Sequence, residues 1–192
     1  MTKYLLVGLG NVGAEYAGTR HNLGFEIADA LVIKHGGKFR GQYLGDLAEL
    51  PWKGRLLLCL KPSTFMNLSG QAVKYWIDKE KIPLDRLLVM VDDVALPRER
   101  IRIRPSGSAA GHNGLQSIQE ELGTDAYPRL RLGIGNDYPR GMQVDYVLGR
   151  WTAAEVPLII RKIEKSVEIV ESFVAMGITR TMNEFNKIEI TL

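Results

Sequence analysis

The chain has 192 residues, of which 45% are apolar and 24% charged, and its formal net charge is +3. This composition excludes a disordered, collagenous or coiled-coil chain. Cys59 is the only cysteine, so no disulfide can form within the chain, and the length is sufficient for a hydrophobic core without one. The sequence lacks an apolar run long enough for a membrane helix and lacks a signal-peptide pattern at its start. We therefore expect a cytoplasmic protein with one domain, residues 1–192.

Short apolar runs alternate with amphipathic segments in the first half of the chain. Apolar runs that end in glycine, proline or aspartate indicate strands, and apolar residues that recur every three or four positions indicate helices. In chain order we expect a strand at 4–9, a helix at 22–34, a weakly alternating strand at 39–50, a strand at 55–60, a helix at 67–79 and a strand at 87–91.

The second half continues this pattern. It contains a strictly alternating strand at 97–104, a short helix at 114–122, a strand at 129–134 and a long helix from Thr152, where Thr152-Ala-Ala-Glu155 forms a capping box. Strands that alternate with helices predict one α/β domain with a mixed, largely parallel central sheet flanked by helices. Functional side chains are then expected in the loops after the carboxyl ends of the parallel strands.

The first such loop, Gly8-Leu-Gly-Asn-Val-Gly13, matches the G-x-G-x-x-G pattern of dinucleotide sites. A dinucleotide site would also need a helix from the second glycine and an acidic residue at the end of the second strand. Here the first helix is predicted only near Asn22, and Asp29 falls inside it. We therefore interpret the glycines as a tight turn close to a ligand.

Histidines and carboxylates follow the predicted strands. His21 is either a general base or a polar residue that satisfies free amides at a helix start, and His112 is either a second site residue or a loop and cap residue. Asp92 and Asp93 end a strand and point to opposite sides, so only one is expected to face a given site. A carboxylate bonded to a histidine fixes its tautomer. A metal site of His21 with both aspartates is disfavoured, because their side chains diverge.

Four asparagines lie in the same loops: Asn11, Asn22, Asn67 and Asn113. A side-chain amide both donates and accepts hydrogen bonds, so it suits the recognition of peptide groups. The alternative for any single asparagine is a turn or cap role.

Arginines recur at every second position from Arg98 to Arg104. In a strand these four guanidinium groups would share one face at a spacing of about 6.6 Å, and Arg129 and Arg131 repeat the pattern. The spacing favours contact with a polyanion such as a nucleic-acid backbone. The alternative is a solvated edge strand whose arginines prevent pairing with other chains.

Together these segments resemble the bacterial-type peptidyl-tRNA hydrolase family. The matching motifs span nearly the whole chain and are residues 8–13 with 16 and 19–22, 61–67 with 69–70, 92–93 with 96–97, 107–108 with 111–114, 129–135, 147–149, 182–183 and 185–186. The resemblance implies hydrolysis of the ester that joins a peptide to the 3′ end of tRNA. It also implies peptidyl-tRNA as the partner, a monomer without an obligate protein partner, and no cofactor or metal.

The resemblance assigns roles to individual residues. His21 matches the general base, Asp92 the residue that orients it, and Asn67 a residue that stabilises the developing oxyanion. It implies substrate binding, including contacts to the peptide and the tRNA 3′ end, by Asn11, Tyr16, Phe65, Met66, His112 and Asn113. It implies tRNA phosphate contacts by Arg102, Arg104 and Arg131.

The chain departs from the family pattern at several positions. Ala110 stands where a glycine is frequent, and Asn136-Asp137 replaces a frequent basic-proline pair. The latter change places an acid near the predicted phosphate track, so it bears on tRNA affinity and not on the chemistry. A non-catalytic RNA-binding relative is the alternative function, but the chain retains His21, Asp92 and Asn67, which argues against it.

Overall fold

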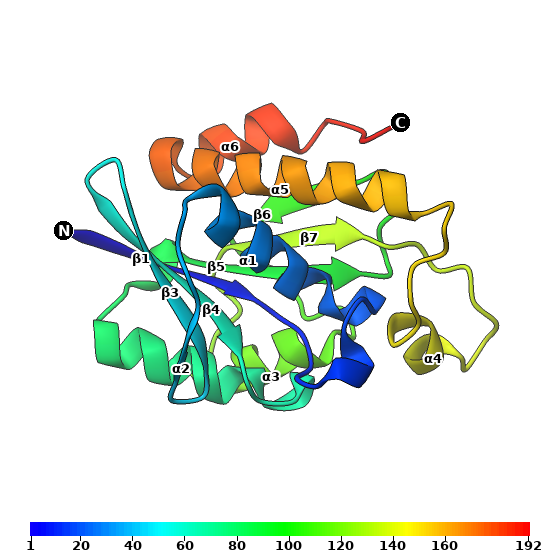
Figure 1. The fold of residues 1–192 in the computed structure, drawn as a ribbon, viewed down its shortest axis with the longest axis horizontal. Coiled ribbons are helices and arrows are strands. Elements are labelled where there is room, and N and C mark those ends of the chain that lie inside the picture. The colour runs from blue at the N-terminus through cyan, green and yellow to red at the C-terminus, as the bar shows by residue number, and fades with distance from the viewer.

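A seven-stranded sheet forms the centre of the computed structural model, which describes residues 1–192 (Figure 1). The strand order is β2-β3-β4-β1-β5-β7-β6. The four central strands pair in parallel: β4 (Arg55–Pro62), β1 (Thr2–Gly8), β5 (Leu87–Asp93) and β7 (Arg129–Gly133). Antiparallel strands complete the two edges: β3 (Gly45–Trp52) with β2 (Arg40–Gln42), and β6 (Ile101–Arg104). The predicted α/β fold with a mixed, largely parallel sheet is confirmed.

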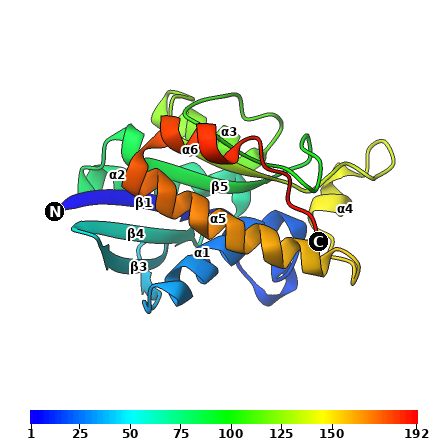
Figure 2. The same ribbon diagram turned by 90° about the horizontal axis from the view of Figure 1, so that it is seen from above.

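Helices cover both faces of the sheet (Figures 1 and 2). One face carries α1 (Leu23–Lys34), α5 (Val156–Met176) and α6 (Ile178–Phe185), and the other carries α2 (Ser69–Glu80) and α3 (Asn113–Leu122). The short helix α4 (Gln143–Val147) lies apart from both layers, beyond the carboxyl ends of the parallel strands (Figure 1). No helix is long and apolar enough to span a bilayer.

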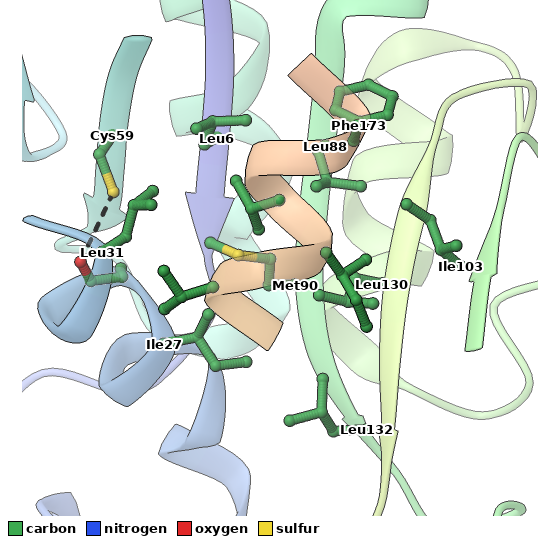
Figure 3. Packing of buried hydrophobic residues seen from close by; sticks show 14 of the residues in the cluster. Leu6, Ile27, Leu31, Cys59, Leu88, Met90, Ile103, Leu130, Leu132 and Phe173 are labelled. Atoms are coloured by element: carbon green, nitrogen blue, oxygen red, sulfur yellow. Dashed lines mark hydrogen bonds between the residues drawn. The ribbon is translucent and has the colours of Figure 1, made fainter. Parts of the chain in front are cut away.

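The two hydrophobic cores follow from the alternation of side chains along the central strands. Leu88 and Met90 of β5 belong to the core under α1 and α5, whereas Val89 between them belongs to the core over α2 and α3. In Figure 3, Ile27 of α1 and Phe173 of α5 lie over the same face of the sheet as Leu88 and Met90. Burial on both faces explains why the central strands read as continuous apolar runs.

Glycines in and after the first loop allow β1 and α1 to pack closely against each other. A Cβ at Gly8 would lie 2.1 Å from the carbonyl oxygen of Gly24, and a Cβ at Gly24 would lie 2.5 Å from the backbone nitrogen of Leu9. Helix α1 begins only at Leu23, and Asp29 lies inside it. The loop therefore lacks the helix N-terminus that a dinucleotide site requires, in line with the sequence interpretation.

Two strand predictions need correction. The strand predicted at 39–50 is a hairpin of β2 and β3, because the chain reverses at Leu44, whose φ is +60°. The strand predicted at 97–104 begins only at Ile101, because residues after Pro97 form a turn in which Arg100 N donates to Pro97 O at 3.0 Å. Within β6 the alternation holds, with Ile101 and Ile103 buried and the two arginines exposed.

The predicted start of the long helix is four residues early, since α5 begins at Val156. The capping box itself is present: Thr152 Oγ1 lies 2.9 Å from Glu155 Oε1, and Glu155 N donates to Thr152 Oγ1 at 3.3 Å. The sequence analysis missed α4, whose five residues are too few to show an apolar stripe, and also α6, although Ile178, Met182 and Phe185 recur there at helical spacing.

Candidate active site

Three polar side chains from distant segments meet at the carboxyl end of β5. His21 lies in a turn of 3₁₀-helix, Arg20–Asn22, just before α1, Asp92 is the penultimate residue of β5, and His112 precedes α3. His21 Nδ1 lies 2.9 Å from Asp92 Oδ2, and His112 Nε2 lies 3.1 Å from Asp92 Oδ1. The two imidazole rings are 4.8 Å apart between centroids. One carboxylate therefore holds two histidines.

The Asp92 contact fixes the state of His21. An ionised carboxylate only accepts hydrogen bonds, so Nδ1 carries the proton and Nε2 of the neutral ring is left as an acceptor. Burial lowers the pKa of His21, but the charge and the hydrogen bond of Asp92 outweigh it and raise that pKa above 6.5. Burial raises the pKa of Asp92, but the two histidines lower it well below the usual range. The pair is therefore arranged to accept a proton at Nε2.

His112 fulfils both of the roles that the sequence left open. Its Nδ1 accepts hydrogen bonds from the backbone amides of Gly114 at 3.1 Å and Leu115 at 3.4 Å, so it caps α3. An accepting Nδ1 places the ring proton on Nε2, which faces Asp92. The cap thus orients the second hydrogen bond to the carboxylate.

Asp93 takes no part in this cluster. Its Oδ1 accepts from Ala95 N at 2.8 Å, and its Oδ2 lies 3.6 Å from Arg131 Nη1. The expectation that only one of the adjacent aspartates faces a given site therefore holds for the contact with the histidines but not for the cavity beside them, which both aspartates line.

A cavity opens beside His21 and Asp92. Its walls include His112, Asn113 and Arg131, together with three residues of α4: Gln143, Val144 and Val147. The sequence reasoning missed these α4 residues, because a helix of five residues leaves almost no periodic signal. The cavity has both charged and apolar walls beside a candidate base, which is typical of a substrate site.

Asn11 is held rigidly at the first loop. Its Oδ1 accepts a hydrogen bond from Met66 N at 2.7 Å, so the side-chain Nδ2 points away from Met66 N. Asn22 fixes the backbone of Asn11 from both sides: Asn11 N donates to Asn22 Oδ1 at 2.8 Å, and Asn22 Nδ2 donates to Asn11 O at 2.9 Å. Asn22 therefore supports Asn11, a role that no sequence signal distinguished from a simple helix start.

The other predicted substrate-binding residues differ in exposure. Asn67 and Asn113 are exposed, Phe65 is 54% exposed, Met66 is buried and Tyr16 is half-buried. Asn113 lines the His21 cavity, whereas Asn11 lines a separate groove and Asn67 lines neither. The loops are nevertheless neighbours, since a Cβ at Gly114 would lie 2.7 Å from the sulfur of Met66.

The predicted row of four arginines is wrong for its first two members. Arg98 pairs with Asp137 at 2.7 Å, and Arg100 pairs with Glu189 at 3.1 Å, so acids within the chain compensate both. The acid of Asn136-Asp137 thus contacts Arg98, which lies outside the predicted phosphate-contact set.

The remaining arginines gather across β6 and β7. Arg102 is opposite Arg131, and Arg104 is opposite Arg129. Arg102 and Arg104 are exposed and have no acidic partner, whereas Arg131 is mostly buried beside Asp93 and donates to Ser108 O. Arg129 is fully buried and donates to Gly107 O at 2.8 Å. The exposed basic surface of this pair of strands is therefore Arg102 and Arg104.

His21, Asp92 and His112 each offer one potential metal-ligand atom, and these three atoms lie within 4.8 Å of one another. This trio differs from the metal set considered from the sequence, which contained both aspartates. Both rings direct an N–H at the carboxylate, so the contacts are hydrogen bonds between donors and one acceptor. A metal ion would instead require ring lone pairs that converge on one point.

Comparisons with known proteins agree with this geometry. The family model described as peptidyl-tRNA hydrolase matches residues 5–191. A peptidyl-tRNA hydrolase of Parabacteroides distasonis is 52% identical over 96% of this chain and 98% of its own length, and one of Bacteroides fragilis is 52% identical over 96% and 99%. A crystal structure of peptidyl-tRNA hydrolase from Acinetobacter baumannii has a TM-score of 0.92 at 32% identity and covers 98% of this chain and 96% of that one. The chain therefore belongs to the peptidyl-tRNA hydrolase family.

Proposed function

We propose that this chain hydrolyses the ester between the peptide and the 3′ end of tRNA in peptidyl-tRNA and so releases free tRNA. Family membership over nearly the full length supports the reaction. The observation that carries the mechanism is the 2.9 Å contact between His21 Nδ1 and Asp92, which leaves Nε2 as a proton acceptor in the cavity.

The reaction needs a base that both takes and returns a proton. His21 Nε2 removes a proton from a water molecule as the water oxygen attacks the ester carbonyl carbon. The tetrahedral intermediate then collapses, the bond to the tRNA 3′ oxygen breaks, and the imidazolium returns its proton to that oxygen. Asp92 stabilises the imidazolium in between, which is the same interaction that raises the pKa of His21.

The uncharged side-chain amides of three asparagines bind the substrate around this base. Asn67 donates to the oxyanion that develops at the ester carbonyl, and Asn11 and Asn113 bind the peptide groups and the tRNA 3′ end. Tyr16, Phe65, Met66 and His112 complete the substrate-binding set. Recognition of a peptide group favours substrates with a blocked amino group over free aminoacyl-tRNA. The mechanism uses no metal or cofactor.

Basic residues at the sheet edge bind the tRNA backbone. Arg102 and Arg104 on the edge strand β6 contact phosphates, and Arg131 on the neighbouring strand β7 does so from the wall of the His21 cavity. This mode of binding tolerates different tRNA sequences. We further propose that the chain acts as a monomer, because the cavity and the His21–Asp92 pair need no residue from a second chain, and that it acts in the cytoplasm, where its tRNA substrate is found.

Turnover of defined substrates tests the function. N-acetyl-aminoacyl-tRNA and the same tRNA with a free amino group are each incubated with the enzyme, with and without a metal chelator. We expect release of free tRNA from the blocked substrate only, at the same rate in the chelator. No release from the blocked substrate would overturn the function, whereas loss of activity in the chelator would overturn the metal-free mechanism.

A further inference from the structure

A polar network that the mechanism does not use begins at the residue before His21. Arg20 is almost fully buried, with 9% of its side chain exposed. Its Nη2 donates to Glu155 Oε1 at 3.0 Å, and its Nη1 donates to the carbonyl oxygen of Tyr146 at 3.1 Å. Both acceptors belong to the segment between β7 and α5, which contains α4.

Ring stacking and backbone contacts reinforce these bonds. The Arg20 guanidinium lies 4.2 Å from the ring centroid of Tyr146 and 5.4 Å from that of Trp151. Its backbone nitrogen donates to Gly149 O at 2.9 Å. A Cβ at Gly149 would lie 2.8 Å from Arg20 Nη1, so a larger residue there would displace the guanidinium from its present position. Arg20 is thus attached to the segment through its main chain and its side chain.

The same segment forms part of the cavity wall. Helix α4 supplies Gln143, Val144 and Val147 to the cavity that contains His21 and Asp92. Tyr146 lies within α4, and its hydroxyl donates to Ile134 O at 2.5 Å after β7. The wall is therefore anchored to the sheet through Tyr146 and to the His21 turn through Arg20.

We propose that Arg20 is a positioning residue that holds α4 against the His21–Asp92 cavity and thereby sets the affinity for peptidyl-tRNA. The planar guanidinium reaches a carboxylate and a carbonyl at once while it stacks on an aromatic ring, which a lysine cannot do. The His21 ring itself is oriented by Asp92 and not by Arg20. Loss of Arg20 therefore weakens substrate binding more than the chemical step. The inference rests on the proposed function only for its kinetic test.

Two variants test the proposal. Arg20→Gln removes the guanidinium, and Glu155→Gln removes the charge of its partner while keeping a side chain that can cap α5 with Thr152. With N-acetyl-aminoacyl-tRNA as substrate we expect KM to rise about tenfold while kcat stays within about threefold of wild type. We also expect faster trypsin cleavage after Arg150, because this exposed residue loses the backbone bridge to Thr19 that holds it when the segment opens.

Val73→Ala is the matched control for a loss of stability. Val73 lies within α2 and is fully buried in the core between the sheet and helices α2 and α3. This core is on the face of the sheet away from α5, and Val73 belongs to no part of the Arg20 network. At a temperature where all variants are folded, its KM and its Arg150 cleavage should equal those of wild type. Wild-type KM and cleavage in Arg20→Gln, or the same changes in Val73→Ala, would overturn the proposal. If wild type fails to cleave the substrate, the function fails, and the proteolysis still tests the attachment of α4.

Discussion

The polar groups of the candidate site fall into two sets, which differ in whether their hydrogen-bond partners lie within the chain. His21, Asp92, His112, Asn11 and Asn22 are buried or nearly so, and each has a hydrogen-bond partner within the chain. Asn67, Asn113, Arg102 and Arg104 are exposed, and their side chains form no hydrogen bond or ion pair within the chain. The first set is oriented before substrate arrives, and the second set is available to bind it.

This difference separates the base and the groups that hold it from exposed side chains whose partners are proposed to lie on the substrate, Asn67 among them. Asn11 and His112 belong to the first set although they are also proposed to bind substrate. A base must have a fixed tautomer and position to act, so its partners belong to the fold. An exposed group whose partner lies on the substrate has no partner in the free chain and faces solvent. The following predictions test this division in order of decreasing effect.

Loss of the proposed base should have the largest effect. We expect His21→Ala to lower kcat by about 10²–10⁴-fold, the usual contribution of a positioned general base. His35→Ala is the control, since His35 pairs with Glu171 at 3.1 Å outside the cavity. Steady-state hydrolysis of N-acetyl-aminoacyl-tRNA by folded protein measures both. Equal activity in the two variants would show that His21 is not the base.

Asn67→Ala should separate activity from stability. Loss of an oxyanion donor costs about 10²–10³ in kcat, while removal of an exposed side chain changes the free energy of unfolding by less than about 0.5 kcal/mol. Asn22→Ala should instead lose about 1–3 kcal/mol of stability, because it leaves buried groups of Asn11 without partners. Denaturant unfolding and kcat, measured on both variants, check the contrast. A large loss of stability in Asn67→Ala would place Asn67 in the wrong set.

The arginines should act on binding and its salt dependence. We expect Arg104→Gln to raise KM, to leave kcat unchanged and to reduce the slope of log affinity against log salt by about 1, the value for one lost phosphate contact. Arg100→Gln is the matched control, because Arg100 already pairs with Glu189. Titrations at several salt concentrations measure the slope. The same change of slope in both variants would contradict the assignment of phosphate contacts to the exposed pair.

The smallest effect is expected at Ala110. Its φ of +50° is unfavourable for a residue with a Cβ, at a cost of about 1–2 kcal/mol, so Ala110→Gly should stabilise the chain slightly after the entropy of the added glycine is subtracted. Ala109 is buried and has no positive φ, so Ala109→Gly should destabilise it. Thermal unfolding compares the two. Destabilisation of both variants by the same amount would show that Ala110 is not strained.

The sequence predicted the parts of this molecule that depend on local patterns. Strand β5 was predictable because burial on both faces makes it apolar throughout, and the pattern of motifs around His21, Asp92 and Asn67 identified the family. Alternation of arginines with apolar residues could not show that Arg98 and Arg100 have acidic partners, because Asp137 and Glu189 are distant in the chain. The position of α4 and the shared contact of His21 and His112 with Asp92 likewise depend on tertiary packing.

The pH dependence of single-turnover hydrolysis tests the central claim, that Asp92 tunes His21 as the base. The base must be neutral, so the rate should rise with pH through the pKa of His21, with a midpoint above 6.5 in wild type. In Asp92→Asn the negative charge that raises this pKa is lost and the amide oxygen can offer only a neutral hydrogen bond, while burial, which lowers the pKa, remains. After subtraction of uncatalysed ester hydrolysis, we expect a slower reaction whose midpoint lies at lower pH than that of wild type. An unchanged midpoint would contradict the account.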